Sequence, residues 1–101
     1  MTSRAREGRY AYLPRASTQV SNRIMAIGFV LIGVEPTKEK EVYQKLLRLD
    51  QIVELYPLFG EYDLIAKVEA DDYNKIGEIV VSGIRTIEGV RATKTLAKMT
   101  F

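Results

Sequence analysis

The segment LFGEYDL, residues 58–64, places the carboxylates of Glu61 and Asp63 beside Gly60. A carboxylate that leaves water needs a cation or several N–H donors, and the free backbone N–H groups of a glycine turn can hold an anion. A site with both features suits a zwitterion, which is the charge pattern of an α-amino acid. The alternative, which composition alone favours, is an ordinary turn with Glu61 in water and Asp63 accepting N–H bonds in the hairpin, because turns are rich in these residue types.

A second polar set lies in EGVRATKT, residues 88–95, where Thr93 and Thr95 share one face of an expected strand. Paired threonine hydroxyls can bind the carboxylate or amide of a ligand. Threonine is also a good strand former, so strand propensity alone explains the pattern equally well.

The composition of the 101-residue chain argues against most catalytic chemistry. It has no cysteine and no histidine, which excludes disulfides, thiolate metal sites, a cysteine nucleophile and the commonest general base at neutral pH. We therefore expect a protein that is not an enzyme and uses no metal or cofactor. No apolar run approaches the roughly 20 residues of a membrane span, and no secretory signal is visible, so we expect a cytoplasmic protein without membrane contact.

The first 23 residues differ from the rest in charge. They carry five arginines and one glutamate, a surplus of +4, whereas the remaining ten basic and twelve acidic residues give −2. The segment has no helical or strand period and is predicted to be a disordered tail. A nucleic-acid-binding arm and an organelle-targeting peptide are two functional interpretations. We favour a start site assigned too far upstream, because Met25 falls where the first strand begins.

The rest of the chain, residues 24–101, alternates between strand and helix patterns. Strands are predicted over 24–35, 52–59, 62–69 and 90–101, and helices over 37–49, with Thr37 as N-cap, and from an Asp71 or Asp72 cap to about Ile87. Gly60-Glu61 is predicted to form a two-residue type II′ turn. VLIGVEP and LIAKVEA, at 30–36 and 64–70, indicate an internal duplication. The order βαββαβ predicts an α+β, ferredoxin-like domain with a four-stranded antiparallel sheet and both helices on one face.

That architecture leaves the other sheet face uncovered. The first strand is apolar in both phases, with Ala26, Val30, Ile32 and Val34 on one side and Met25, Ile27, Phe29 and Leu31 on the other. A half-solvated sheet should alternate apolar with polar residues. We therefore predict a homodimer packed sheet on sheet into a dimeric α/β barrel. The alternative is a tail that folds back over the face through Tyr10, Tyr12 and Leu13.

Taken together, FGEYDLIAKVEADD and IRTIEGVRATKT resemble the effector-binding half, or RAM domain, of the Lrp/AsnC feast-and-famine regulators. The resemblance covers about residues 27–101. It implies dimers paired through their sheets, often assembled into octamers, and amino-acid effectors bound between subunits near the hairpin. Carried over by position, Gly60, Tyr62 and Asp63 match the hairpin motif, Glu61 fills its variable slot, and Thr93 and Thr95 match the strand that completes the pocket. Tyr56 and Leu58 are added from geometry alone.

One departure from the family is large. Full-length members carry an N-terminal helix-turn-helix of about 60 residues, whereas 23 residues precede the first strand here. The chain thus resembles the stand-alone RAM proteins, for which direct sequence-specific DNA binding is not expected. Regulation would then pass through a full-length Lrp/AsnC-type regulator or another partner.

The leading functional hypothesis is an amino-acid-sensing module that modulates oligomeric assembly or a transcription-regulator partner. Two alternatives remain open. One is a dimeric-barrel enzyme of the monooxygenase or isomerase type, since the same fold hosts such chemistry. The other is a structural oligomer or a nucleic-acid accessory protein. An ACT-type amino-acid sensor shares the element order and is a near neighbour of the leading hypothesis.

Overall fold

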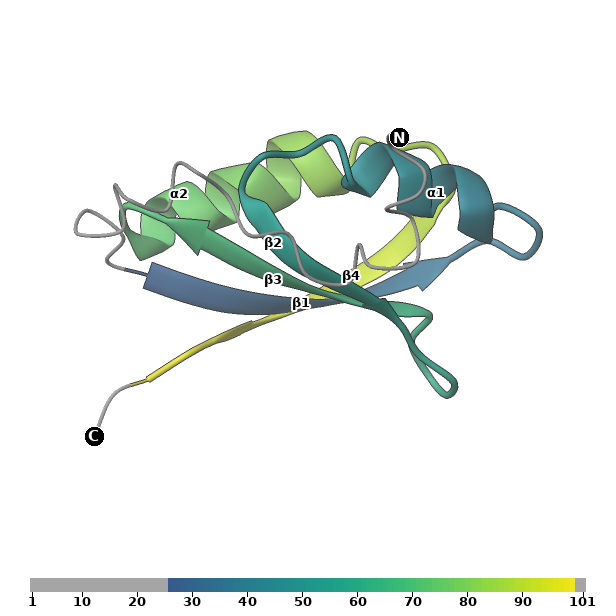
Figure 1. Ribbon diagram of the computed structural model, residues 1–101, viewed down its shortest axis with the longest axis horizontal. Coiled ribbons are helices and arrows are strands. Elements are labelled where there is room, and N and C mark those ends of the chain that lie inside the picture. The colour runs from purple at the N-terminus through teal and green to yellow at the C-terminus, as the bar shows by residue number, and fades with distance from the viewer. Residues whose placement is uncertain (1–25, 100–101) are drawn as a thin grey trace.

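The computed structural model of the chain describes residues 26–99. The predicted tail, Met25 and the end of the last predicted strand lie outside the described residues. The elements are β1 (Ala26–Val34), α1 (Glu39–Leu46), β2 (Ile52–Pro57), β3 (Leu64–Ala70), α2 (Tyr73–Glu78), the π-helix η3 (Ile79–Ile84) and β4 (Val90–Ala97). The predicted order βαββαβ is confirmed, with α2 and η3 forming one continuous helical segment (Figure 1).

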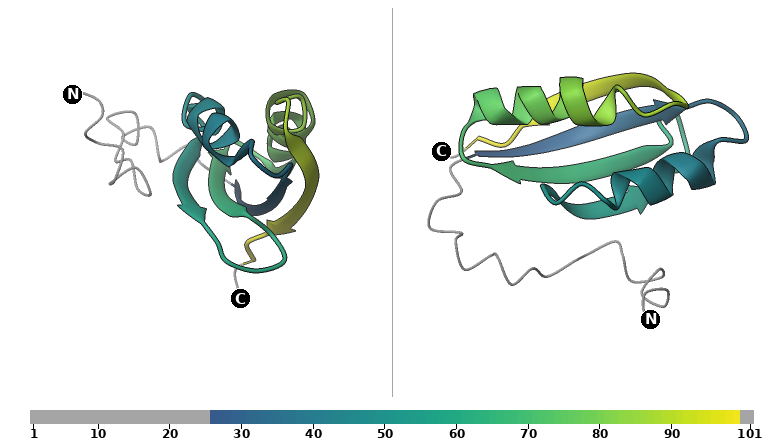
Figure 2. Two further views of the ribbon diagram at one scale, coloured as in Figure 1. Left: turned by 90° about the vertical axis from the view of Figure 1, so that its right-hand side faces the viewer. Right: turned by 90° about the horizontal axis from the view of Figure 1, so that it is seen from above.

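The four strands form one antiparallel sheet in the order β2-β3-β1-β4. The two central strands, β1 and β3, are those that carry the duplicated sequences. Val30 of β1 lies between Ala66 of β3 and Thr95 of β4. Both helical segments lie on the same face of this sheet, as the two views of Figure 2 show. The ferredoxin-like α+β fold predicted from the sequence is therefore confirmed.

The core lies between the sheet and the helices and is wholly apolar. No polar or charged side chain among residues 26–99 is buried. Every second residue of β1 and β3 faces the core, and Val42 and Leu46 of α1 and Ile76 of α2 pack onto that surface. These are the positions that the strand and helix periods predicted. Burial of these side chains is the main force that holds the helices on the sheet.

The helix starts agree with the prediction in one case and not in the other. Asp72 caps α2, since its Oδ1 accepts a hydrogen bond from the Lys75 amide at 2.8 Å. The prediction that Thr37 caps the first helix is wrong. Thr37 has a φ of +72° and lies in a turn in which the Lys38 amide bonds to the Glu35 carbonyl, so the N-cap is Lys38, which makes no side-chain capping bond.

The second helix also departs from the predicted α-helix over its last turns. From Ile79 to Ile84 it is a π-helix, and the Arg85 amide bonds to the Val80 carbonyl at 2.8 Å, five residues back. This wider turn allows Ile79, Val80 and Ile84 all to be buried. The helical segment ends at Ile84, three residues before the predicted end at Ile87.

Gly89, the residue before β4, has a positive φ of +103°. A Cβ at this position would lie 2.8 Å from Cγ2 of Val42, on α1. The Gly89 carbonyl also accepts a hydrogen bond from the Glu35 amide at 2.7 Å. Only glycine therefore fits where the chain passes α1 and enters β4.

Candidate functional site

The β2–β3 hairpin carries most of the predicted site residues. Its connection runs over six residues, Leu58 to Asp63, and closes through a hydrogen bond from the Leu58 amide to the Asp63 carbonyl at 2.8 Å. The predicted two-residue turn at Gly60-Glu61 is therefore wrong. The reason lies outside the hairpin: the Asp63 amide bonds to the Ile32 carbonyl of β1 at 2.9 Å, so the start of β3 is held by β1 while the loop opens.

The Asp63 carboxylate is already engaged within the chain. Its Oδ2 accepts a hydrogen bond from the Val34 amide at 2.7 Å. Glu61 differs, because its side chain is exposed and makes no hydrogen bond or ion pair with the residues that the structure describes. Gly60 has a φ of +154° and open space around the position of a Cβ. Of the two carboxylates beside Gly60, Glu61 is the one free to bind a ligand.

The aromatic and apolar residues of the hairpin are exposed. Phe59, at the tip, has its full surface in solvent, and Leu58 and Tyr56 are about 40% exposed. The Tyr56 hydroxyl donates a hydrogen bond to Oε1 of Glu54 at 3.0 Å. This bond to a carboxylate, aided by desolvation and by the Glu54 charge, raises the pKa of the Tyr56 phenol above its ordinary value.

The sheet face opposite the helices is apolar along β1 and polar toward β2. Ile27, Phe29 and Leu31 point to this face and are half-buried within the single chain. Across β3 and β2, Lys67 lies 3.5 Å from the carboxylate of Glu54 and 3.9 Å from that of Glu69. The predicted apolar face is therefore present along β1, and a cluster of ion pairs lies beside it on β3 and β2.

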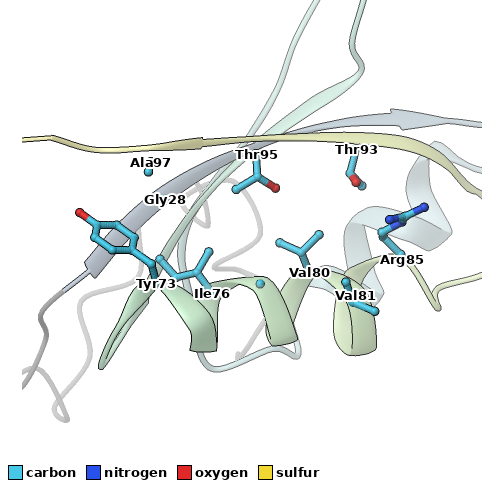
Figure 3. Close-up of a pocket in the computed structure, with 10 residues that line it drawn as sticks. Gly28, Tyr73, Ile76, Val80, Val81, Arg85, Thr93, Thr95 and Ala97 are labelled. Carbon is cyan, nitrogen blue, oxygen red and sulfur yellow. The ribbon is translucent and has the colours of Figure 1, made fainter.

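A groove of about 430 Å³ lies between β4 and the α2–η3 segment (Figure 3). Its polar lining consists of Tyr73, Arg85, Thr93 and Thr95. Tyr73 and Arg85 lie at opposite ends in Figure 3, and the Arg85 side chain extends toward β4. The Tyr73 hydroxyl donates a hydrogen bond to the Lys98 carbonyl at 2.8 Å. Of the groove residues within 26–99, Arg85 is the only charged one.

The rest of the groove is apolar or bare backbone. Ile76, Val80, Val81 and Ala97 supply its aliphatic surface. Gly28 of β1 lies at its floor, where a Cβ would come within 3.1 Å of Ile76 Cγ2. The glycine thus lets α2 approach the sheet closely at one end.

The hairpin and the groove are separate features of one chain. No residue from 56 to 63 lines the groove. Ile32 of β1 lies between Leu64, which follows the hairpin, and Thr93 of β4, so two strand spacings separate these residues. Thr93 and Thr95 are on the helix side of the sheet, as groove residues. A single chain therefore does not bring the predicted site residues together.

Sequence reasoning missed Tyr73 and Arg85 as groove residues. Tyr73, Ile76 and Val80 have the spacing of a core stripe, but Tyr73 is 52% exposed and only the other two are buried. The orientation of Arg85 depends on the π-turn, for which the sequence offered no signal.

The described part of the chain contains no cluster of three or more histidine, cysteine, aspartate or glutamate residues able to hold a metal ion. None of its helices is long and apolar enough to cross a membrane.

The chain is thus a small ferredoxin-like domain with an open groove beside its last strand. The model of the Lrp/AsnC ligand binding domain family matches residues 27–99, and the chain belongs to this family.

The HTH-type transcriptional regulator PH1916 of Pyrococcus horikoshii is 35% identical over 71 residues, which cover 67% of this chain and 47% of that protein. The chain thus spans about half the length of the curated relatives that it matches. The crystal structure of FFRP-DM1 is 35% identical, with a TM-score of 0.71, over 74% of this chain and all of that one. The regulator NMB0573 of Neisseria meningitidis, solved as an L-Met complex, shares the fold with a TM-score of 0.73 at 16% identity, over 88% of this chain and 58% of that one.

Proposed function

We propose that this chain is a regulatory sensor in transcription whose amino-acid effector binds where two chains meet. The observation that carries the proposal is the separation of two complementary half-sites. Glu61 offers an exposed carboxylate on the hairpin, with no hydrogen bond or ion pair to any other residue within 26–99. The groove offers the Thr93 and Thr95 hydroxyls and the Arg85 guanidinium. An α-amino acid needs an anion for its ammonium group and donors for its carboxylate, and each half-site supplies one of these.

Chains meet, in this proposal, through the uncovered sheet face. The half-buried side chains of Ile27, Phe29 and Leu31 form an apolar strip along a central strand, and a second copy related by a twofold axis covers it sheet on sheet. The ion-paired Glu54, Lys67 and Glu69 then lie beside this strip, on its β3 and β2 side. Dimers joined further, for example into an octamer, bring the hairpin of one chain to the groove of another.

The regulatory step follows from shared binding. An effector that contacts two chains stabilises whichever assembly brings those chains together, and the assembly in turn favours effector binding. Asp63 holds the hairpin on β1, and Tyr56, Leu58 and Tyr62 flank the ligand. A transcription regulator responds to the change in assembly. This regulator is either the longer protein to which such a domain belongs or a separate partner. The naming of the relatives as transcriptional regulators supports this role over catalysis.

A thermal-shift screen against the common amino acids, methionine included, tests the proposal. A ligand at about a hundred times its Kd adds about 2.7 kcal/mol to the free energy of unfolding, which is easily seen for a domain of this size. We expect at least one amino acid to raise Tm and to change the assembly state in light scattering. Glu61→Gln should abolish both effects while leaving Tm without ligand unchanged. The absence of any shift across the panel would refute an amino-acid effector.

A further inference from the structure

The groove between β4 and the α2–η3 segment has an uneven distribution of charge. Among the lining residues that the structure describes, Arg85 is the one cation and none is acidic. The guanidinium is a planar fork of N–H donors that matches a carboxylate in bidentate geometry. Figure 3 shows Arg85 at one end of the groove, at the same end of β4 as Thr93. A ligand carboxylate bound there has donors from both residues.

The π-turn is what aims Arg85 at this end. The bond from the Arg85 amide to the Val80 carbonyl closes the wide turn, and both residues then line the groove. Val80 itself is buried, so the turn that carries Arg85 is anchored in the core. The carboxylate anchor is thus attached to a fixed part of the fold, although its side chain is exposed.

The remaining surface does not suit a polar ligand side chain. Ile76, Val80 and Val81 offer only aliphatic contact. The O–H of Tyr73 is already used in its hydrogen bond to the Lys98 carbonyl. A side-chain ammonium would meet no carboxylate among the described lining residues. A side-chain amide would find only the Thr95 and Tyr73 hydroxyl oxygens as acceptors for its N–H groups. A polar group removed from water without partners lowers affinity.

We propose that the groove selects α-amino acids with an uncharged aliphatic or aromatic side chain, with Arg85 as the carboxylate anchor. This inference rests on the proposed function, because it concerns the same effector. It adds the ligand class and a residue that the hairpin motif does not contain.

Isothermal titration calorimetry on the full chain tests the ligand class with matched pairs. Leucine is compared with asparagine, which has a similar branched shape, and norleucine with lysine, which adds only the ammonium group. We expect the apolar member of each pair to bind at least about tenfold more tightly, the ratio that one unpaired polar group produces. Equal or tighter binding of asparagine or lysine, relative to its apolar partner, overturns the proposal.

The anchor is tested with Arg85→Gln against Arg48→Gln. Arg48 is an exposed arginine just beyond α1 and is not a groove residue, so its variant controls for the loss of one positive charge. Arg85→Gln should raise the Kd for the preferred amino acid by at least about tenfold, and Arg48→Gln should leave it unchanged. Unfolding curves of both variants establish that the fold is retained. Equal Kd values for the two variants overturn the role of Arg85.

These outcomes separate this inference from the proposed function. If leucine binds, and Arg85→Gln but not Glu61→Gln weakens it, the groove selects the ligand as argued and the interface site is wrong. If a charged amino acid binds and depends on Glu61, the interface site stands and the inference fails. If no amino acid binds, both fail.

Discussion

Asp63 Oδ2 accepts a hydrogen bond from the Val34 amide at 2.7 Å, although the two residues are 29 positions apart in the chain. The bond ties the start of β3 to the end of β1, next to the hairpin that carries Glu61. Asp63, which the sequence marks as a candidate ligand carboxylate, is therefore first a structural residue. Its neighbour in the motif, Glu61, is the one left free for a ligand.

Because of this bond, removing the Asp63 carboxylate should lower the free energy of unfolding more than removing the Glu61 carboxylate. Asp63→Ala leaves the amide of buried Val34 without its partner and should lower the free energy of unfolding by about 1–3 kcal/mol. Glu61→Ala, at an exposed position, should change it by less than about 0.5 kcal/mol. Urea unfolding of both variants without ligand measures the difference. Equal stability of the two variants would show that the Asp63 bond does not hold the hairpin in place.

Gly89 provides a second test of the fold. Gly89→Ala forces a Cβ to within 2.8 Å of Val42 Cγ2 and places alanine at a φ of +103°. Overpacking and backbone strain each cost about 1–3 kcal/mol, so we expect a clearly lowered Tm. Gly77→Ala is the matched control, because Gly77 lies in α2 with open space at its Cβ position. Alanine there should stabilise the helix by about 0.5–1 kcal/mol. A Gly89→Ala variant as stable as the parent would contradict the close approach of α1.

The pKa of Tyr56 is the third prediction. Its hydroxyl donates to Glu54, and this bond, desolvation and the Glu54 charge all favour the protonated phenol, so the pKa is raised. A raised pKa stabilises the folded state below the ordinary tyrosine pKa of about 10, and that contribution is lost as the pH rises through the higher folded value. Tyrosinate absorbance, taken as the difference between parent and Tyr56→Phe, should give a pKa above that of free tyrosine. In Glu54→Gln the pKa of Tyr56 should fall toward that of free tyrosine. An identical Tyr56 pKa in the parent and in Glu54→Gln would exclude Glu54 as the cause.

The uncovered sheet face supplies the fourth prediction. Phe29 lies at its centre, between Lys67 of β3 and Leu96 of β4. Phe29→Glu would bury a charge in a sheet-to-sheet interface, which is strongly unfavourable, so light scattering should show a shift to monomer. Gln44→Glu adds the same charge on the exposed side of α1 and should leave the assembly unchanged. An unaltered oligomer in Phe29→Glu would place the interface elsewhere.

The fold was largely readable from the sequence because it depends on local patterns. The alternating residues of β1 and β3 and the spacing of Val42 and Leu46 identify the buried faces, and Asp72 signals the start of α2. Topology then follows from the order of the elements and the handedness of their connections.

The features that sequence reasoning missed depend on distant contacts or on backbone details. The prediction of a two-residue turn is wrong because Asp63 forms hydrogen bonds with the backbone of Ile32 and Val34. No local sequence pattern reveals these contacts. Arg85 follows a π-turn that its amide closes onto Val80, and Tyr73 has the helical spacing of Ile76 but is exposed, so the sequence identifies neither as a groove residue. The sequence therefore suggests the hairpin residues and Thr93 and Thr95 as candidate site residues, but it does not reveal the groove in which the threonines lie.

The most direct test of a site shared between chains is a complementation experiment. Glu61→Gln removes the hairpin carboxylate, and Thr95→Phe fills the groove of the other half-site, at an exposed strand position. Each variant alone should fail to bind the amino acid that shifts Tm of the parent. When the two are unfolded, mixed and refolded together, some assemblies pair an intact hairpin from one chain with an intact groove from the other, so calorimetry should recover binding at a fraction of the sites. A mixture that binds no more than either variant alone would contradict a site built from two chains.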